Sequence, residues 1–193
     1  MTLEPHPDFE GLKGRLAAGG ALFRRFSGAC YRFAAPRYAG PTELVSGEGA
    51  RRFGSRWLPP GVAAAVHGST RPELAMAESL AQHRRANIPD WEAMPLVVCG
   101  VRVVVGRMLD LTEREHRRAL RISLDRLLGV DWRAENTAGR ESLSQAVGRA
   151  AFADLRIEAL LVPSAVDGPG ANLVVFPARL AGRSRLSALQ PRT

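Results

Sequence analysis

An apolar run at residues 96–105 constrains the fold more than any other feature of the sequence. The run is rich in β-branched residues and predicts a buried strand, in which Gly100 marks a bend or a bulge. It falls far short of the ~20 apolar residues that a bilayer-spanning helix needs. A buried strand needs neighbours in a sheet, and four shorter apolar runs are candidates: residues 29–33, 62–67, 160–163 and 172–176.

Helix-start signals lie between these strands. Residues 70–73 fit a capping box and predict a helix that runs to about Arg85. Residues 112–115 are a second capping box, which predicts a helix with several leucines on one side, and residues 142–145 suggest a third capped helix. We expect a loop at residues 131–140 and a loosely held arm or short helix at residues 1–20. Strands and helices alternate without a regular βαβ period, so the sequence predicts a single α+β domain.

The charge composition bears on the classes of partner. The 193 residues carry a net charge of +8, which invites a nucleic-acid hypothesis. Nearly all of that charge is arginine spread along the chain, Lys13 being the only lysine, and no basic run is interleaved with aromatic residues. We therefore expect no direct binding to nucleic acid and none to a membrane.

The N-terminus and the cysteines indicate the compartment. Residues 1–8 lack the basic and apolar regions of a signal peptide, which predicts a cytoplasmic protein. Cys30 and Cys99 lie in no metal-binding spacing, so we expect two buried free thiols and no metal site.

Residues 46–61 concentrate glycines and arginines in a short stretch. Glycine lets a backbone approach a ligand closely and arginine is a fork of donors suited to anions, so the stretch is a candidate anion-binding loop. A surface loop with solvated arginines is the alternative, and Arg56 fits either role. Phe53 and Trp57 could stack on a flat ring or pin the loop to the core. The stretch lacks the G-x-G-x-x-G pattern of dinucleotide-binding folds.

Two charged residues lie within apolar patterns. Glu78 shares a helix face with Leu74, Ala77 and Ala81, where a carboxylate must be paired, protonated or turned toward a ligand. Arg32 lies inside the short strand at residues 29–33, where it is either exposed at an edge or directed toward a site.

Several short motifs occur in an order that resembles the RES domain family, which is named for an arginine, a glutamate and a serine far apart in sequence. They lie at residues 31–33, 46–51, 56–57, 59–61, 77–78, 109–112, 145–148, 162–165 and 172–177. We expect an N-terminal arm at residues 1–28, a RES domain at residues 29–188 and a C-terminal tail at residues 189–193.

The resemblance implies an ADP-ribosyltransferase-like fold, with a split, mostly antiparallel sheet flanked by helices and a site for NAD. It makes Arg32, Glu78 and Ser164 the catalytic candidates. Glu78 would stabilise the cationic sugar that forms as nicotinamide leaves, and Ser164 would hydrogen-bond the nicotinamide ribose. The residues expected to bind NAD are Arg32, Gly49, Arg56, Trp57, His67 and Ser164.

The implied activity is that of a toxin that cleaves the nicotinamide–ribose bond of NAD and passes ADP-ribose to phosphate or water. Transfer to a target protein and a catalytically impaired relative are the alternatives. The chain departs from the family at His67, where a tyrosine is usual, and at Leu58, where an asparagine is usual. The implied partner is an antitoxin of the Xre type with a helix-turn-helix domain, and a homodimer is compatible with the sequence.

Overall fold

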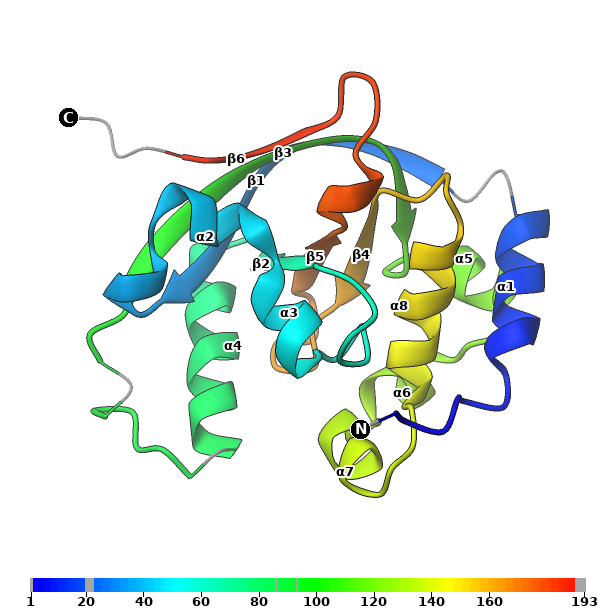
Figure 1. Cartoon of the computed structure of the whole chain (residues 1–193), viewed down its shortest axis with the longest axis horizontal. Coiled ribbons are helices and arrows are strands. Elements are labelled where there is room, and N and C mark those ends of the chain that lie inside the picture. The colour runs from blue at the N-terminus through cyan, green and yellow to red at the C-terminus, as the bar shows by residue number, and fades with distance from the viewer. Residues whose placement is uncertain (1, 20–22, 86, 93, 190–193) are drawn as a thin grey trace.

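The computed structural model describes residues 2–19, 23–85, 87–92 and 94–189. Two long antiparallel strands form the spine of the molecule and arch across the top of Figure 1. They are β1, Phe23–Ala34, and β3, Val97–Asp110, with Arg32 paired to Cys99. Strands were predicted at both places, but each is longer than the apolar run that indicated it. A bend or bulge was predicted at Gly100, but Gly100 pairs in register with Tyr31. The register shifts instead between Arg24 and Phe26 on β1.

Four shorter strands complete the sheet: β2 (Val66–Ser69), β4 (Ala159–Pro163), β5 (Ala171–Val175) and β6 (Arg185–Ala188). The hydrogen-bonded order is β1-β2-β5-β4-β3-β6, and β1 also pairs with β3. Five strands therefore follow one another around a closed path, while β6 adds to the edge of β3. Among the strand pairs described, β3–β4 is parallel and the others are antiparallel, in agreement with the predicted mostly antiparallel sheet.

Helices flank this sheet, as predicted. Figure 1 shows α4 (Pro72–Arg85) on one side, and α1 (Phe9–Ala18) beside α8 (Leu143–Ala153) on the other. The shorter helices are α2 (Pro41–Ser46), α3 (Glu48–Phe53), α5 (Arg114–Ala119), α6 (Leu124–Leu128) and α7 (Trp132–Thr137). Single 3-10 turns lie at Pro36–Tyr38 and Pro177–Arg179. No helix in the described ranges combines the length and the apolar character needed to cross a bilayer.

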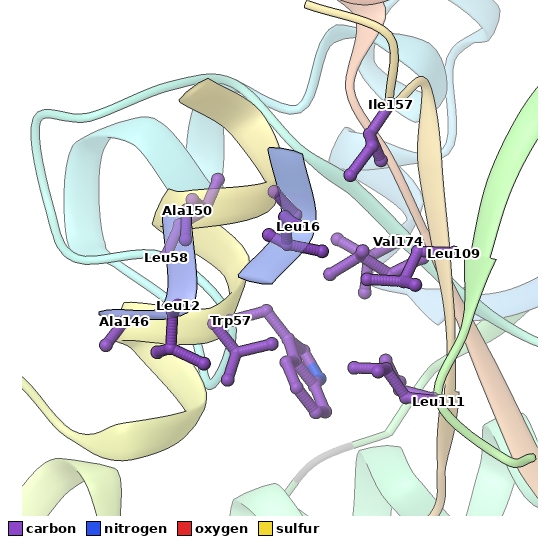
Figure 2. Close-up of a cluster of buried hydrophobic side chains, with 14 of the residues drawn as sticks. Leu12, Leu16, Trp57, Leu58, Leu109, Leu111, Ala146, Ala150, Ile157 and Val174 are labelled. Carbon is purple, nitrogen blue, oxygen red and sulfur yellow. The ribbon is translucent and has the colours of Figure 1, made fainter. Parts of the chain in front are cut away.

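The core lies on both faces of the sheet. On β5, Val174 belongs to one cluster of buried side chains and Leu173 and Val175 belong to the other, because successive side chains of a strand point to opposite faces. Figure 2 shows the first cluster, in which α1, α8 and the loop that carries Trp57 pack against the sheet. Cys30 and Cys99 are buried and free, as predicted.

Some local predictions fail for identifiable reasons. The capping box at residues 112–115 does not form, because α5 begins at Arg114 with Glu113 rather than Thr112 at its N-cap position, and no side chain caps it. The helix expected there is broken into α5 and α6, with Arg121 between them in a left-handed conformation at φ 57°. Residues 131–140 are not simply a loop, because the Asp131 side chain caps α7. Strand β6 was not predicted, whereas the Ser142–Gln145 capping box of α8 is confirmed.

Candidate active site

Glu78 lies at the centre of a polar cluster formed by α4, β5 and the segment after β4. Its carboxylate is half-buried, and one of its oxygens, Oε1, accepts two hydrogen bonds. The donors are Ser164 Oγ at 2.7 Å and Asn172 Nδ2 at 2.6 Å. Charge-assisted hydrogen bonds of this length are among the stronger polar contacts in proteins, so they fix the Glu78 side chain. The sequence alone did not indicate what this carboxylate pairs with. In the structure its two hydrogen-bond partners are both neutral groups.

Asn172 is the first of these donors and comes from β5. It pairs in register with Ser69 on β2 and with Val162 on β4, so strands hold it on both sides. The Ser69 hydroxyl donates to Asn172 Oδ1 at 2.6 Å, which leaves the amide nitrogen turned toward Glu78. The side chains of Ser69, Asn172 and Glu78 therefore form a continuous chain of hydrogen bonds.

Ser164 is the second donor and is almost fully buried directly after β4. Its hydroxyl oxygen accepts from the backbone N–H groups of Val166 and Asp167 at 3.0 and 3.1 Å. Since a hydroxyl has one hydrogen, and that hydrogen is directed to Glu78, the structure places Ser164 as a partner of the carboxylate. The contact with a ribose that the resemblance implied for Ser164 stays a prediction.

Arg32 and His67 lie within electrostatic range of each other, and His67 shares strand β2 with Ser69 of this cluster. Arg32, in β1, donates from Nη1 to the carbonyl oxygen of Leu44 at 3.2 Å, and burial lowers the pKa of its guanidinium. His67, in β2, is two residues before Ser69, so the two side chains share a face of the sheet. Burial, aided by the positive charge of Arg32, lowers the pKa of His67 to about 4. Its imidazole is therefore neutral at pH 7.

One ring nitrogen of His67 has unused bonding capacity. Nε2 is buried and has no hydrogen-bond partner among the described residues. A buried polar atom without a partner is uncommon and costs free energy, so such an atom is a candidate ligand contact. This is consistent with the prediction that His67 binds NAD in place of the usual tyrosine.

Arg56 is anchored to a different part of the chain. Its Nη2 donates to the carbonyl oxygens of Leu127 and Leu128, at 3.0 and 2.6 Å, at the end of α6. Burial and the nearby charge of Arg85 lower the pKa of Arg56, whereas the carboxylate of Glu78 acts in the opposite direction. The influence of Glu78 on this pKa indicates that Arg56 lies within electrostatic range of Glu78.

The glycine-rich stretch at residues 46–61 is not the open loop that its composition suggested. Much of it forms α3, and Arg51 there pairs with Glu48 on the surface. Gly49 is exposed within α3, and a Cβ added to it would meet no atom within 4 Å. Gly47 is the constrained glycine, because its φ is 68° and an added Cβ would lie 2.6 Å from the Ala65 nitrogen.

Trp57 and Leu58 belong to the core. Trp57 is 3% exposed, and Figure 2 shows its ring among apolar side chains, so it pins the segment rather than offering a surface on which a ligand could stack. Leu58 is fully buried, at the position where the resemblance implied an asparagine. The segment is instead held by Gln145 Nε2, which donates to the carbonyl oxygen of Ser55 at 3.0 Å, and by the Ser55 hydroxyl, which accepts from the backbone N–H of Leu58.

The structure thus joins Ser164 directly to Glu78 and places Arg56 within electrostatic range of that carboxylate. Arg32 is within electrostatic range of His67, but it pairs with Cys99 and donates to Leu44, and no described contact joins it to Glu78. Trp57 is buried in the core and Gly49 is exposed on α3. Sequence reasoning missed Ser69 and Asn172 as site residues. Asn172 opens a motif of the resemblance, which was the one available signal. Within the described residues, no three His, Cys, Asp or Glu side chains are grouped as a metal site would require.

Comparison with known proteins identifies the family of the chain. A sequence model of the RES domain matches residues 29–191, so the chain belongs to the RES domain family. The chain is similar to the NAD(+) phosphorylase MbcT of Mycobacterium tuberculosis (strain H37Rv), and equally to MbcT of Mycobacterium bovis. Each is 33% identical over 171 residues, which cover 86% of this chain and 80% of the relative.

A solved structure is similar over most of the chain. It is the crystal structure of the M. tuberculosis MbcT-MbcA toxin-antitoxin complex, with a TM-score of 0.72 and 30% identity. The match covers 94% of this chain and 90% of the solved one, so the fold of the MbcT toxin extends over nearly the whole molecule described above.

Proposed function

We propose that this protein is a toxin that cleaves the bond between nicotinamide and ribose in NAD and transfers the ADP-ribosyl group to phosphate. The observation that carries the proposal is the half-buried carboxylate of Glu78, which neutral donors hold in place within electrostatic range of Arg56. The similarity to MbcT, named an NAD(+) phosphorylase, supports the choice of substrate and of acceptor.

Each residue has a task in this reaction. Arg32 and Arg56 bind the pyrophosphate, since a guanidinium offers several donors to phosphate oxygens. As the C1′–N bond of the nicotinamide ribose breaks, its electron pair moves to the pyridine nitrogen and positive charge develops on the sugar. The Glu78 carboxylate stabilises that charge more in the transition state than in bound NAD, which lowers the barrier. A phosphate oxygen then forms the new bond to C1′.

The proposal includes a partner. The solved relative is a toxin-antitoxin complex, which supports an antitoxin that binds and neutralises this chain. We infer that this antitoxin is of the Xre type with a helix-turn-helix domain. An acidic segment of it that reaches the arginines of the site would be attracted to a chain of net charge +8. Such a complex would keep the enzyme inactive in the cytoplasm until the antitoxin is removed.

The decisive experiment measures NAD concentration over time with purified protein, with and without phosphate. We expect loss of NAD that depends on phosphate, and a fall of about 1,000-fold in rate for Glu78→Gln, because the neutral amide cannot stabilise a developing cation. Loss of NAD without phosphate would indicate hydrolysis instead. If NAD is consumed only when a protein acceptor is added, the activity is protein ADP-ribosylation, and no loss under any condition would overturn the proposal in favour of an impaired relative.

A further inference from the structure

The two oxygens of Glu78 have different surroundings. Oε1 accepts from both Ser164 and Asn172, whereas no described residue donates to Oε2. A carboxylate oxygen with two short hydrogen bonds has little capacity left for a further partner. The carboxylate is therefore divided into one oxygen that the protein holds and one that is free for a ligand.

Both donors are themselves fixed. The Ser69 hydroxyl donates to Asn172 Oδ1 at 2.6 Å, so the amide has one orientation in which every group is satisfied. The reverse orientation would set Oδ1 against the carboxylate, acceptor against acceptor. The backbone N–H groups of Val166 and Asp167 donate to Ser164 Oγ, which directs its hydrogen to Glu78.

We propose that Asn172 is a positioning residue for Glu78, and that Ser69 sets the orientation of its amide. Asn172 and Ser164 hold Oε1 so that Oε2 faces the sugar carbon at which the bond breaks. This proposal rests on the proposed function, because it assigns the reacting atom to NAD. Its physical basis is preorganisation: a group already fixed in its productive geometry needs no reorganisation in the transition state, and small displacements are costly.

The kinetic test compares Asn172→Ala, Asn172→Asp and Ser69→Ala with the native protein. We expect kcat for NAD cleavage to fall about 10- to 100-fold in Asn172→Ala, with KM for NAD changed less than about threefold, because the lost contact acts on the transition state. Asn172→Asp has the same size but no N–H donor, so its kcat should fall at least as far. Aspartate also sets a second carboxyl group against Glu78, so retention of kcat in this variant would overturn the proposal.

A double-mutant cycle tests the role of Ser69. Ser69→Ala alone should lower kcat by about threefold. The Asn172 amide can still donate to Glu78 in this variant, but Ser69 no longer fixes its orientation. The same substitution in the Asn172→Ala background should have no further effect on kcat, because the group that Ser69 orients is gone. Additive losses would show that Ser69 acts independently of Asn172 and would overturn that part of the proposal.

A spectroscopic test does not depend on turnover. In the native protein the side-chain amide protons of Asn172 should exchange slowly with solvent and resonate apart from those of exposed asparagines, because one of them is bound to a carboxylate. Glu78→Ala should remove both features. If the native protein consumes no NAD, the proposed function fails while this measurement still decides whether Asn172 holds Glu78. An Asn172 signal that Glu78→Ala leaves unchanged would overturn the proposal.

Discussion

The neutral state of His67 has a consequence for stability as a function of pH. Its pKa is about 4 in the folded chain and about 6.5 in an unfolded one, so below pH 6.5 the unfolded state binds a proton that the folded state does not. Stability therefore falls as pH drops through this window, by about 1.4 kcal/mol per pH unit. At pH 5 the expected loss from this residue is about 2 kcal/mol.

Urea unfolding of the native protein and of His67→Gln at pH 7 and pH 5 measures this effect. The native protein should lose more stability between the two values than the variant, because glutamine does not titrate. An equal loss in both proteins would mean that His67 is as readily protonated in the folded chain as in the unfolded one.

Sequence reasoning reached individual site residues better than their contacts. An arginine in an apolar strand and a glutamate on an apolar helix face are conflicts with burial that can be read from the chain, and together with the resemblance they made Arg32 and Glu78 site candidates. The contact between Ser69 and Asn172 joins residues 103 positions apart, and Glu78 is 94 positions from Asn172. Such pairs depend on strand register, which neighbouring residues along the chain do not specify.

At the scale of elements, the contact between α8 and the Trp57 segment shows why one short motif has its composition. Gln145 of α8 binds the carbonyl oxygen of Ser55, and Gly148 lies one turn later against Trp57. A Cβ added at Gly148 would lie 1.6 Å from the Trp57 carbonyl oxygen. Residues 145–148 therefore serve packing, and through it the placement of Arg56, rather than chemistry.

Gly148→Ala should accordingly be strongly destabilising. Neither α8 nor the Trp57 backbone can yield easily, because both are buried, so we expect a loss of more than about 3 kcal/mol or failure to fold. Gly49→Ala is the matched control. It lies within α3 with open space around it, and alanine should leave stability unchanged or raise it by up to about 1 kcal/mol.

Thermal unfolding of the two variants gives the comparison. A Gly148→Ala protein as stable as the native one would show that α8 does not approach the segment so closely. The Gly49→Ala protein also tests the predicted role of Gly49 in NAD binding. An unchanged KM for NAD would mean that only the backbone of residue 49 contributes to binding, because alanine forms the same helical backbone.

The elements themselves were predicted unevenly for a physical reason. Strands β4 and β5 and helices α4 and α8 have strong local signals, so the first three were found close to their observed bounds and the start of α8 was found at its capping box. Strand β6 pairs along only four residues with β3 and has alternating exposure, so its order depends on a partner far along the chain. The capping box at Thr112 did not form, since the backbone N–H and the hydroxyl of Thr112 both donate to Asp110 Oδ1 in a local turn and α5 begins two residues later.

At the scale of the whole molecule, the folded unit extends beyond the segment that carries the family resemblance. The RES match begins at residue 29, yet α1 lies before it and closes the first core cluster. The preceding segment is also bound, because Glu4 exchanges backbone hydrogen bonds with Gly139 and Glu141. The arm predicted for residues 1–28 is thus in part a packed helix, while residues 190–193 of the predicted tail lie outside the described residues.

Substitution of Leu16 tests whether α1 is part of the folded core. Its side chain is 1% exposed in α1 and packs between α8 and the sheet, as Figure 2 shows. Leu16→Ala should cost about 3 kcal/mol, because it removes buried methyl groups and leaves a cavity that rigid neighbours cannot fill. Leu155→Ala is the control, since Leu155 is 72% exposed and its truncation should change stability by less than about 0.5 kcal/mol.

Urea unfolding should give a single transition for both variants, with the midpoint lowered only in Leu16→Ala. Trp57 lies in the same cluster as Leu16, so a probe of the core and a probe of backbone structure should report the same midpoint. A near-neutral Leu16→Ala would mean that α1 is a detachable arm and that residues 29–188 fold alone. The expected loss would instead make the N-terminal helix part of the structure that holds Arg56 in place, because α8 contacts α1 on one side and the Trp57 segment through Gly148.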